Sequence, residues 1–153
     1  QDGACTKHVT TTAKVAHPYE FYHDEPGFNY RMPNLNAALG CAQIEGLTNF
    51  LELKRKLALE YKGFFAGSEY SFIEEPDYAE SNYWLNSIIC PDKGARDYLL
   101  KETNTLGVMT RPIWTLMTRL PMYESSLHGD LSFSEWLESR LINLPSSPAV
   151  GVT

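Results

Sequence analysis

Apolar residues recur at helical spacing through the first half of the chain. Leu35, Ala38, Leu39 and Ala42 fall at positions i, i+3, i+4 and i+7. A second set keeps nearly the same period: Phe50, Leu53, Leu57, Tyr61 and Phe64. The pattern predicts one long helix from about Asn34 to about Phe65, with a bend at Gly46 and an end at Gly67.

The second half alternates between strand-like and helix-like segments. Runs rich in aromatic and β-branched residues predict strands over 70–74, 83–90 and 108–113, with an acidic loop after the first. Helical patterns cover 94–104 and 133–143, the latter with Ser132 and Glu135 spaced as in a capping box. Such alternation predicts a small α/β (α+β) layer domain.

Composition fits a globular core. The chain has 153 residues, 43% of them hydrophobic, which is enough for one domain or for one domain and part of another. The net charge of −6 argues against a nucleic-acid surface, which needs clustered cations. The one basic cluster, Lys54 to Lys56, lies in the helical pattern and is interpreted as a solvated face.

The cysteines and the absence of a recognisable targeting segment predict a location in the cytoplasm. Cys5, Cys41 and Cys90 are odd in number and widely spaced, which suggests neither a disulfide framework nor a zinc site. Cys41, among small apolar residues, is expected to be buried. No membrane span or signal peptide is recognisable, so the cytoplasm is the default expectation. Because the sequence starts without methionine, it reads as a fragment.

The stretch from His23 to Gln43 combines a glycine turn, a polar cluster and a helix start. Gly27 allows a tight turn just before Asn29, Tyr30 and Arg31. Pro33 suits the first turn of a helix and Asn34 suits a cap, so Arg31 would lie near a positive helix end. Such a place can bind phosphate. The spacing alone slightly favours a simpler interpretation, in which Gly27 and Pro33 are ordinary turn residues and Arg31 is a surface ion-pair donor.

The identities of the residues in this stretch carry more information than their spacing. GFNYRMPNLNAALGCAQ resembles the signature that follows the cofactor lysine in DegT-type nucleotide-sugar aminotransferases, which are pyridoxal-phosphate enzymes. The resemblance extends through LELKRKLALEYKGFF, SNYWLN, GVMTRPIWTLM, LPMY and LINLPSS, and so covers essentially the whole chain. Within this family, the sequence is most similar to the subgroup that makes 4-amino sugars on the routes to legionaminic acid and similar bacterial surface sugars.

The resemblance implies a domain division. Residues 1–46 would be the tail of the large cofactor-binding domain of the aspartate-aminotransferase (type I) fold, and residues 47–153 its small C-terminal domain with the long connecting helix. The Schiff-base lysine of the family would lie upstream of Gln1. Neither Lys7 nor Lys14 stands in a matching motif, and both are interpreted as surface lysines.

The resemblance also implies site residues. Asn29 matches an asparagine that reaches across a homodimer to the cofactor phosphate of the neighbouring subunit. Arg31 matches a cationic position that would face the cofactor phosphate or the diphosphate of the sugar nucleotide, although an ion pair with Asp24 or Glu25 explains it about as well. His23 would line the same cleft, or serve as a structural hydrogen-bond donor.

The segment TRPIWTLMTRLPMY would form a second, substrate-binding wall. Arg111 offers an anion partner, Trp114 a stacking face for a sugar or uracil ring, and Tyr123 a hydroxyl. Alternatively, Trp114 would be a core aromatic between two layers. Many relatives carry histidine where this chain has Thr118, so this chain departs from the family pattern at that position.

The implied activity of the intact protein is transamination. Pyridoxal phosphate would carry an amino group from a donor, glutamate by expectation, to the 4-keto group of a nucleotide-linked deoxysugar. The fragment alone would be inactive because its lysine lies elsewhere. The alternative is a non-catalytic regulator or sensor that keeps the fold but has lost the lysine. Neither nucleic acid nor a membrane is an expected partner.

Overall fold

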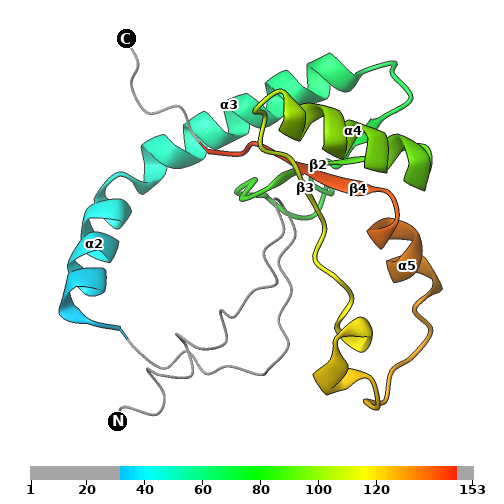
Figure 1. Cartoon of the computed structure of the whole chain (residues 1–153). Coiled ribbons are helices and arrows are strands. Elements are labelled where there is room, and N and C mark those ends of the chain that lie inside the picture. The colour runs from blue at the N-terminus through cyan, green and yellow to red at the C-terminus, as the bar shows by residue number, and fades with distance from the viewer. Residues whose placement is uncertain (1–31, 148–153) are drawn as a thin grey trace.

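The computed structural model describes residues 32–147, and it begins with two consecutive helices. Helix α2 (Asn34–Glu45) and helix α3 (Leu47–Phe65) meet at Gly46. Figure 1 shows them as an arc that leads from the start of the described chain to the sheet. The long helix and its bend are therefore confirmed. Gly67, with φ 76°, turns the chain away after α3, a conformation that glycine adopts at little cost.

The start of α2 differs from the expectation. Pro33, not Asn34, is the residue that precedes the first helical turn, and no side chain caps the helix there. Asn34 is already helical. The prediction that Asn34 caps the helix is thus wrong, because Pro33, with φ −59° and ψ 153°, occupies the cap position.

A four-stranded antiparallel sheet forms the centre of the molecule. Its strands are β1 (Ser71–Phe72), β2 (Asn86–Ile89), β3 (Arg111–Pro112) and β4 (Leu141–Leu144), in the spatial order β1-β2-β4-β3. Strand β2 pairs with β4 over all four of its residues, from Asn86 opposite Leu144 to Ile89 opposite Leu141. The last strand of the described sequence is therefore an inner strand.

One face of the sheet carries the core. Ile88 and Ile142 are fully buried and lie opposite each other on β2 and β4. The C-terminal half of α3 and helix α4 (Lys93–Thr105) cover this face, with Phe65 and Leu100 packed in the same cluster. Helix α4 begins at Asp92, whose carboxylate accepts from the backbone N–H of Ala95 at 2.8 Å. The mixed helix-and-sheet fold class is as predicted.

The C-terminal helix is shorter than its pattern indicated. Helix α5 (Ser132–Glu138) ends early, and residues 141–144 form strand β4, so the helix predicted over 133–143 is half wrong. Pairing on both sides and full burial of Ile142 outweigh the helical spacing of the apolar residues. The predicted capping box is also wrong, because the N–H and hydroxyl of Ser132 both bond to Asp130.

The three predicted strands are present but short. The strands expected over 70–74, 83–90 and 108–113 reduce to Ser71–Phe72, Asn86–Ile89 and Arg111–Pro112. Loops that carry side-chain bonds take up the remainder. The short edge strands β1 and β3 leave much of the β2 and β4 flanks to be covered by other side chains.

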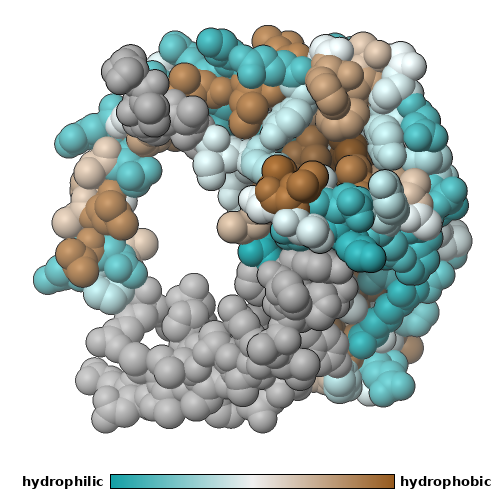
Figure 2. Space-filling model, turned by 45° about the horizontal axis from the view of Figure 1, so that its top comes forward, coloured by the Kyte–Doolittle hydropathy of each residue, from teal (hydrophilic) through white to brown (hydrophobic). Residues whose placement is uncertain are grey.

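Helix α2 buries none of its side chains against the described residues. Leu35, Leu39 and Ile44 are each more than 60% exposed. Figure 2 shows apolar and polar surface side by side along this arm at the left of the view. Cys41 is also exposed, so the prediction that it is buried is wrong for this structure. Its neighbours are apolar, but nothing described packs on them.

Within residues 32–147, no helix is both long enough and apolar enough to cross a membrane. Cys90 is buried in the core and Cys41 is on α2, so these two thiols are far from forming a pair. The break at Gly46 coincides with the predicted domain boundary. The division into residues 1–46 and 47–153 itself stays a prediction.

Candidate functional site

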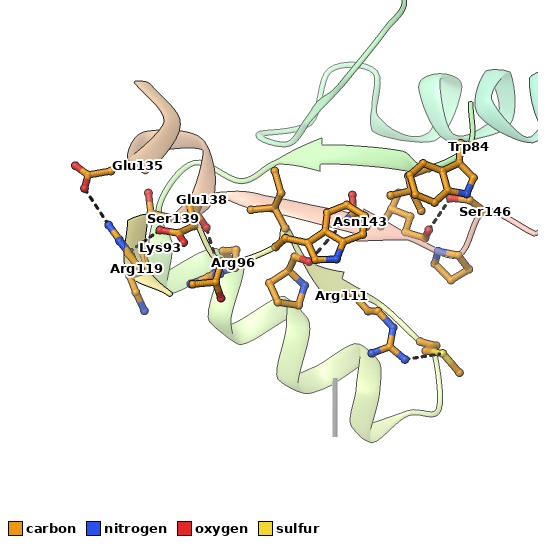
Figure 3. Close-up of a pocket in the computed structure, with 18 of the residues that line it drawn as sticks. Trp84, Lys93, Arg96, Arg111, Arg119, Glu135, Glu138, Ser139, Asn143 and Ser146 are labelled. Atoms are coloured by element: carbon orange, nitrogen blue, oxygen red, sulfur yellow. Dashed lines mark hydrogen bonds and ion pairs between the residues drawn. The ribbon is translucent and has the colours of Figure 1, made fainter. Parts of the chain in front are cut away.

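A groove of about 850 Å³ lies along the edge strand β3. It runs from the residues before β2 and after β4 to the start of α4 and to α5. Figure 3 shows side chains from these separate elements pointing toward one space. Its lining includes Trp84, Arg111, Trp114, Glu138, Asn143 and Ser146.

Strand β3 places Arg111 at this groove. Arg111 pairs with Asn143 of β4, and the Asn143 amide donates to the Pro112 carbonyl at 3.4 Å. Across the sheet the Ser87 hydroxyl donates to the Asn143 side-chain oxygen at 2.7 Å. Asn143 lies on the opposite strand face from buried Ile142, so the groove borders the polar face of the sheet. The Arg111 guanidinium also donates to the Met109 sulfur.

Trp114 stacks on Trp84 rather than lying in the core. Their ring centroids are 6.1 Å apart and the ring planes differ by 22°. Trp114 is 53% exposed and Trp84 is 65% exposed, so each ring contacts the other ring on one face and leaves part of its surface open to solvent. Offset stacks of this kind are favourable, and their free faces can receive another flat or apolar ring.

The turn that carries Trp84 has an unusual backbone. Tyr83 has a φ of 44°, which is uncommon for a residue other than glycine. The N–H of Tyr83 donates to the Ser81 hydroxyl, and the N–H of Trp84 donates to the Asn82 side-chain oxygen. The carbonyls of both residues accept from the Lys54 ammonium. Side-chain bonds therefore hold a strained conformation in place.

Two members of the basic cluster on α3 are structural. Lys54 bonds to three carbonyls and is half-buried, which lowers its pKa through desolvation. Arg55 makes a bidentate pair with Glu75 at 2.6 and 3.0 Å. The same pair, together with the Ser81 N–H, lowers the pKa of Glu75. The solvated-face interpretation is wrong for Lys54 and Arg55; of the cluster, Lys56 alone is exposed.

The opposite end of the groove is built from charged side chains. One Glu138 oxygen accepts from the Leu116 backbone N–H at 2.8 Å, and the other pairs with Arg119. Arg119 also reaches Glu135 at 3.2 Å. This network ties α5 to the segment after β3, so that Trp114 sits on a braced stretch of chain. Figure 3 shows Arg119 between the two glutamates.

The predicted site residues fall into three groups. Arg111 and Trp114 lie together in the groove. Tyr123 lies in the short 3-10 helix Pro121–Tyr123 and does not line the groove; Thr118 lies in the preceding 3-10 helix, Met117–Arg119. His23, Asn29 and Arg31 lie outside the described residues. Sequence reasoning missed Trp84, although its SNYWLN motif was among the segments that carried the resemblance.

The described residues do not by themselves fit pyridoxal phosphate. A Schiff-base lysine must be desolvated and must face the cofactor. In residues 32–147 the lysine with a pKa lowered by burial is Lys54, but its ammonium is engaged with three backbone carbonyls. Lys93 lines the groove and pairs with Asp97. Neither is placed to hold the aldehyde.

Known proteins with similar sequences are longer than this chain. GDP-perosamine synthase of Vibrio cholerae is 34% identical over 133 residues, which cover 85% of this chain and 36% of that protein. GDP-4-keto-6-deoxy-D-mannose 3-dehydratase of Yersinia pseudotuberculosis is 27% identical, with 84% and 35% covered. The chain thus spans about a third of the length of these relatives.

Solved structures agree in fold. The Helicobacter pylori aminotransferase PseC, involved in the biosynthesis of pseudoaminic acid, superposes with a TM-score of 0.71 at 17% identity, covering 84% of this chain and 36% of that one. DesI, determined with its TDP-sugar product, also gives 0.71 at 22% identity, with 82% and 33% covered. The model of one sequence family matches residues 2–152. The chain therefore belongs to the DegT/DnrJ/EryC1/StrS aminotransferase family.

Proposed function

We propose that this chain is the C-terminal part of a pyridoxal-phosphate-dependent aminotransferase that transfers an amino group from glutamate to the 4-keto group of a nucleotide-linked deoxysugar. The family match over residues 2–152 carries the proposal. The similarity to GDP-perosamine synthases supports a nucleotide-sugar substrate. The legionaminic-acid subgroup rests on the sequence resemblance alone, while two relatives that are 34% identical, both GDP-perosamine synthases, point to perosamine.

The groove would bind the sugar nucleotide. Arg111 supplies a cation for a diphosphate, and the free face of the Trp84–Trp114 pair supplies an apolar surface for a flat ring. The cofactor would be bound by residues outside the described part: a lysine of the longer protein, and Asn29 and Arg31 across a homodimer. This assembly would work in the cytoplasm, with His23 near the same cleft.

The direct test uses the longer protein that contains this chain. Incubation with pyridoxal phosphate and glutamate should convert the absorbance of a lysine-bound cofactor into that of its amine form. A GDP-4-keto-6-deoxy sugar should then give an amino sugar, detected by mass spectrometry. If the cofactor absorbance does not change with glutamate, the regulator or sensor alternative is favoured. If the sugar loses a hydroxyl without gaining nitrogen, the activity instead matches that of the 3-dehydratase relatives.

Variants test the groove separately. Arg111→Gln and Trp114→Leu should raise KM for the nucleotide sugar by about tenfold or more, because each removes a direct contact. Matched controls are Arg140→Gln and Trp136→Leu, a cation–ring pair with centroid distance 5.0 Å that does not line the groove. If the control variants raise KM as much as the groove variants do, the groove is not the substrate-binding site. Asn29→Ala should weaken cofactor retention while leaving these KM values alone.

A further inference from the structure

The ring of Trp84 is not held by packing alone. Trp84 is 65% exposed, and besides the groove it borders a second hollow of about 410 Å³. With open space on two sides, its stacked position against Trp114 needs another source of order. An aromatic side chain has only two rotatable bonds, and the rotamers that it can adopt depend on its backbone conformation, so a fixed backbone limits where the ring can lie.

Lys54 provides that backbone anchor. Its ammonium donates to the carbonyls of Tyr83 at 3.3 Å and of Trp84 at 3.2 Å. The positive φ of Tyr83 is costly, and an alternative turn conformation would move both carbonyls away from the ammonium. The bonds from α3 therefore favour the turn that directs Trp84 toward the groove.

The same ammonium also bonds to the segment that follows β4, which lies beside Trp84 (Figure 3). It donates to the Ser146 carbonyl at 2.8 Å, and Ser146 lies just beyond strand β4. The Ser146 hydroxyl in turn accepts from the Asn86 backbone N–H at 2.7 Å. One cation thus connects α3 with the segments that enter β2 and leave β4, both of which line the groove.

The partners of Lys54 indicate a geometric role. Its three donors match three carbonyl acceptors, and among residues 32–147 no carboxylate pairs with it. A half-buried ammonium without a counter-charge pays for desolvation that a methionine or leucine would avoid. Lys56, two residues further along the same helix, is exposed and so offers a control position on α3.

We propose that Lys54 is a positioning residue that fixes the Tyr83–Trp84 turn and so holds the Trp84 ring against Trp114 as a two-ring platform. The platform suits the flat base or the apolar sugar face of a nucleotide sugar. This assignment of the ligand rests on the proposed function. The role of Lys54 in holding the two rings together does not.

The first experiment therefore needs no substrate. In the full-length protein, two stacked indoles give a paired circular-dichroism signal, assigned by its loss in Trp84→Phe and Trp114→Phe and its retention in Trp136→Phe. Lys54→Met should lose the signal while the helix signal and the thermal midpoint stay near those of the Lys56→Met control. A retained signal in Lys54→Met overturns the proposal.

A second variant, Lys54→Gln, tests the proposal if Lys54→Met fails to fold. Lys54→Gln keeps two N–H donors on a shorter side chain and should lose the paired signal in the same way. If Lys54→Met and Lys54→Gln both unfold, Lys54 is required for the fold as a whole and the positioning role is wrong.

Kinetics then connect the platform to substrate. Lys54→Met should raise KM for the nucleotide sugar about three- to tenfold with kcat almost unchanged, the range expected for losing one aromatic contact. The effects of Lys54→Met and Trp84→Phe should not add, since both act through one ring. If the paired signal is lost but KM stays constant, Lys54 positions the ring and the ligand assignment fails. An inactive wild-type protein would contradict the proposed function alone.

Discussion

Helix α2 and the sheet region are built on opposite principles. Helix α2 has correct helical spacing but leaves Leu35, Leu39 and Ile44 exposed. The sheet region has strands of only two to four residues, yet Ile88 and Ile142 are fully buried. Local sequence pattern thus specifies α2, whereas long-range contact specifies the sheet. Short helices without packing are marginal in water, and α2 gains little support from packing among the described residues.

The most damaging substitution should be in the sheet. Ile142→Ala removes a fully buried side chain from the inner strand and should lower the free energy of unfolding by about 2–5 kcal/mol. Leu39→Ala on α2, which is 62% exposed, should change it by less than about 0.5 kcal/mol. Urea denaturation of the two variants measures both. Similar losses would mean that α2 is packed as tightly as the sheet.

Thiol reactivity should separate the two regions next. Cys41 on α2 is exposed, while burial raises the pKa of the Cys90 thiol to about 11. Because the thiolate is the reacting species, iodoacetamide at pH 8 should modify Cys41 rapidly and Cys90 only after unfolding. Mass spectrometry of a Cys5→Ser variant follows both sites. Rapid labelling of Cys90 under native conditions would show that the core opens readily.

A smaller effect is expected at the glycine between the regions. Gly67 has a positive φ and open space around it, so Gly67→Ala should destabilise the fold by about 1 kcal/mol through backbone strain alone. Gly63→Ala, inside α3 and equally unobstructed, should instead stabilise it by about 0.5–1 kcal/mol. Thermal unfolding measures both signs. The same sign for both variants would contradict the conformational explanation.

The smallest effect concerns the ion pair that joins α3 to the loop before β2. Arg55 and the Ser81 N–H lower the pKa of Glu75 below its usual 4.5. Its contribution to stability is therefore full above about pH 4.5 and is lost as pH falls through the folded pKa. Glu75→Gln should flatten this part of the stability–pH curve. Glu80→Gln, whose carboxylate lies 3.8 Å from Arg55, should leave the curve almost unchanged.

The sequence predicted elements well where local spacing decides them. The α2–α3 helix, its break at Gly46 and helix α4 follow from apolar periodicity and breakers. Strand β4 was missed because Leu141, Ile142 and Leu144 continue a helical spacing, and only their partners on β2 and β3 make them a strand. The exposure of Cys41 was missed for a related reason, since composition cannot show whether a partner surface is present.

The candidate site was partly predictable. Arg111 and Trp114 lie close in sequence on one motif, and the structure places both in the groove. Trp84 is far away in sequence and reaches Trp114 only through the β2–β4–β3 order of the sheet. Lys54 was interpreted as a solvated cation because a sequence does not show backbone carbonyls, which are its partners here.

The position of β4 has a consequence for synthesis on the ribosome. Strand β4 joins β2 to β3, but it is the last of the four strands to be translated. Until residues 141–144 leave the exit tunnel, the nascent chain has two separate strand edges with unpaired backbone groups. Helices α3 and α4 can form earlier, yet the groove beside β3 exists only after the final strand is inserted. Premature termination before Leu141 would therefore release an aggregation-prone intermediate rather than a slightly shortened domain.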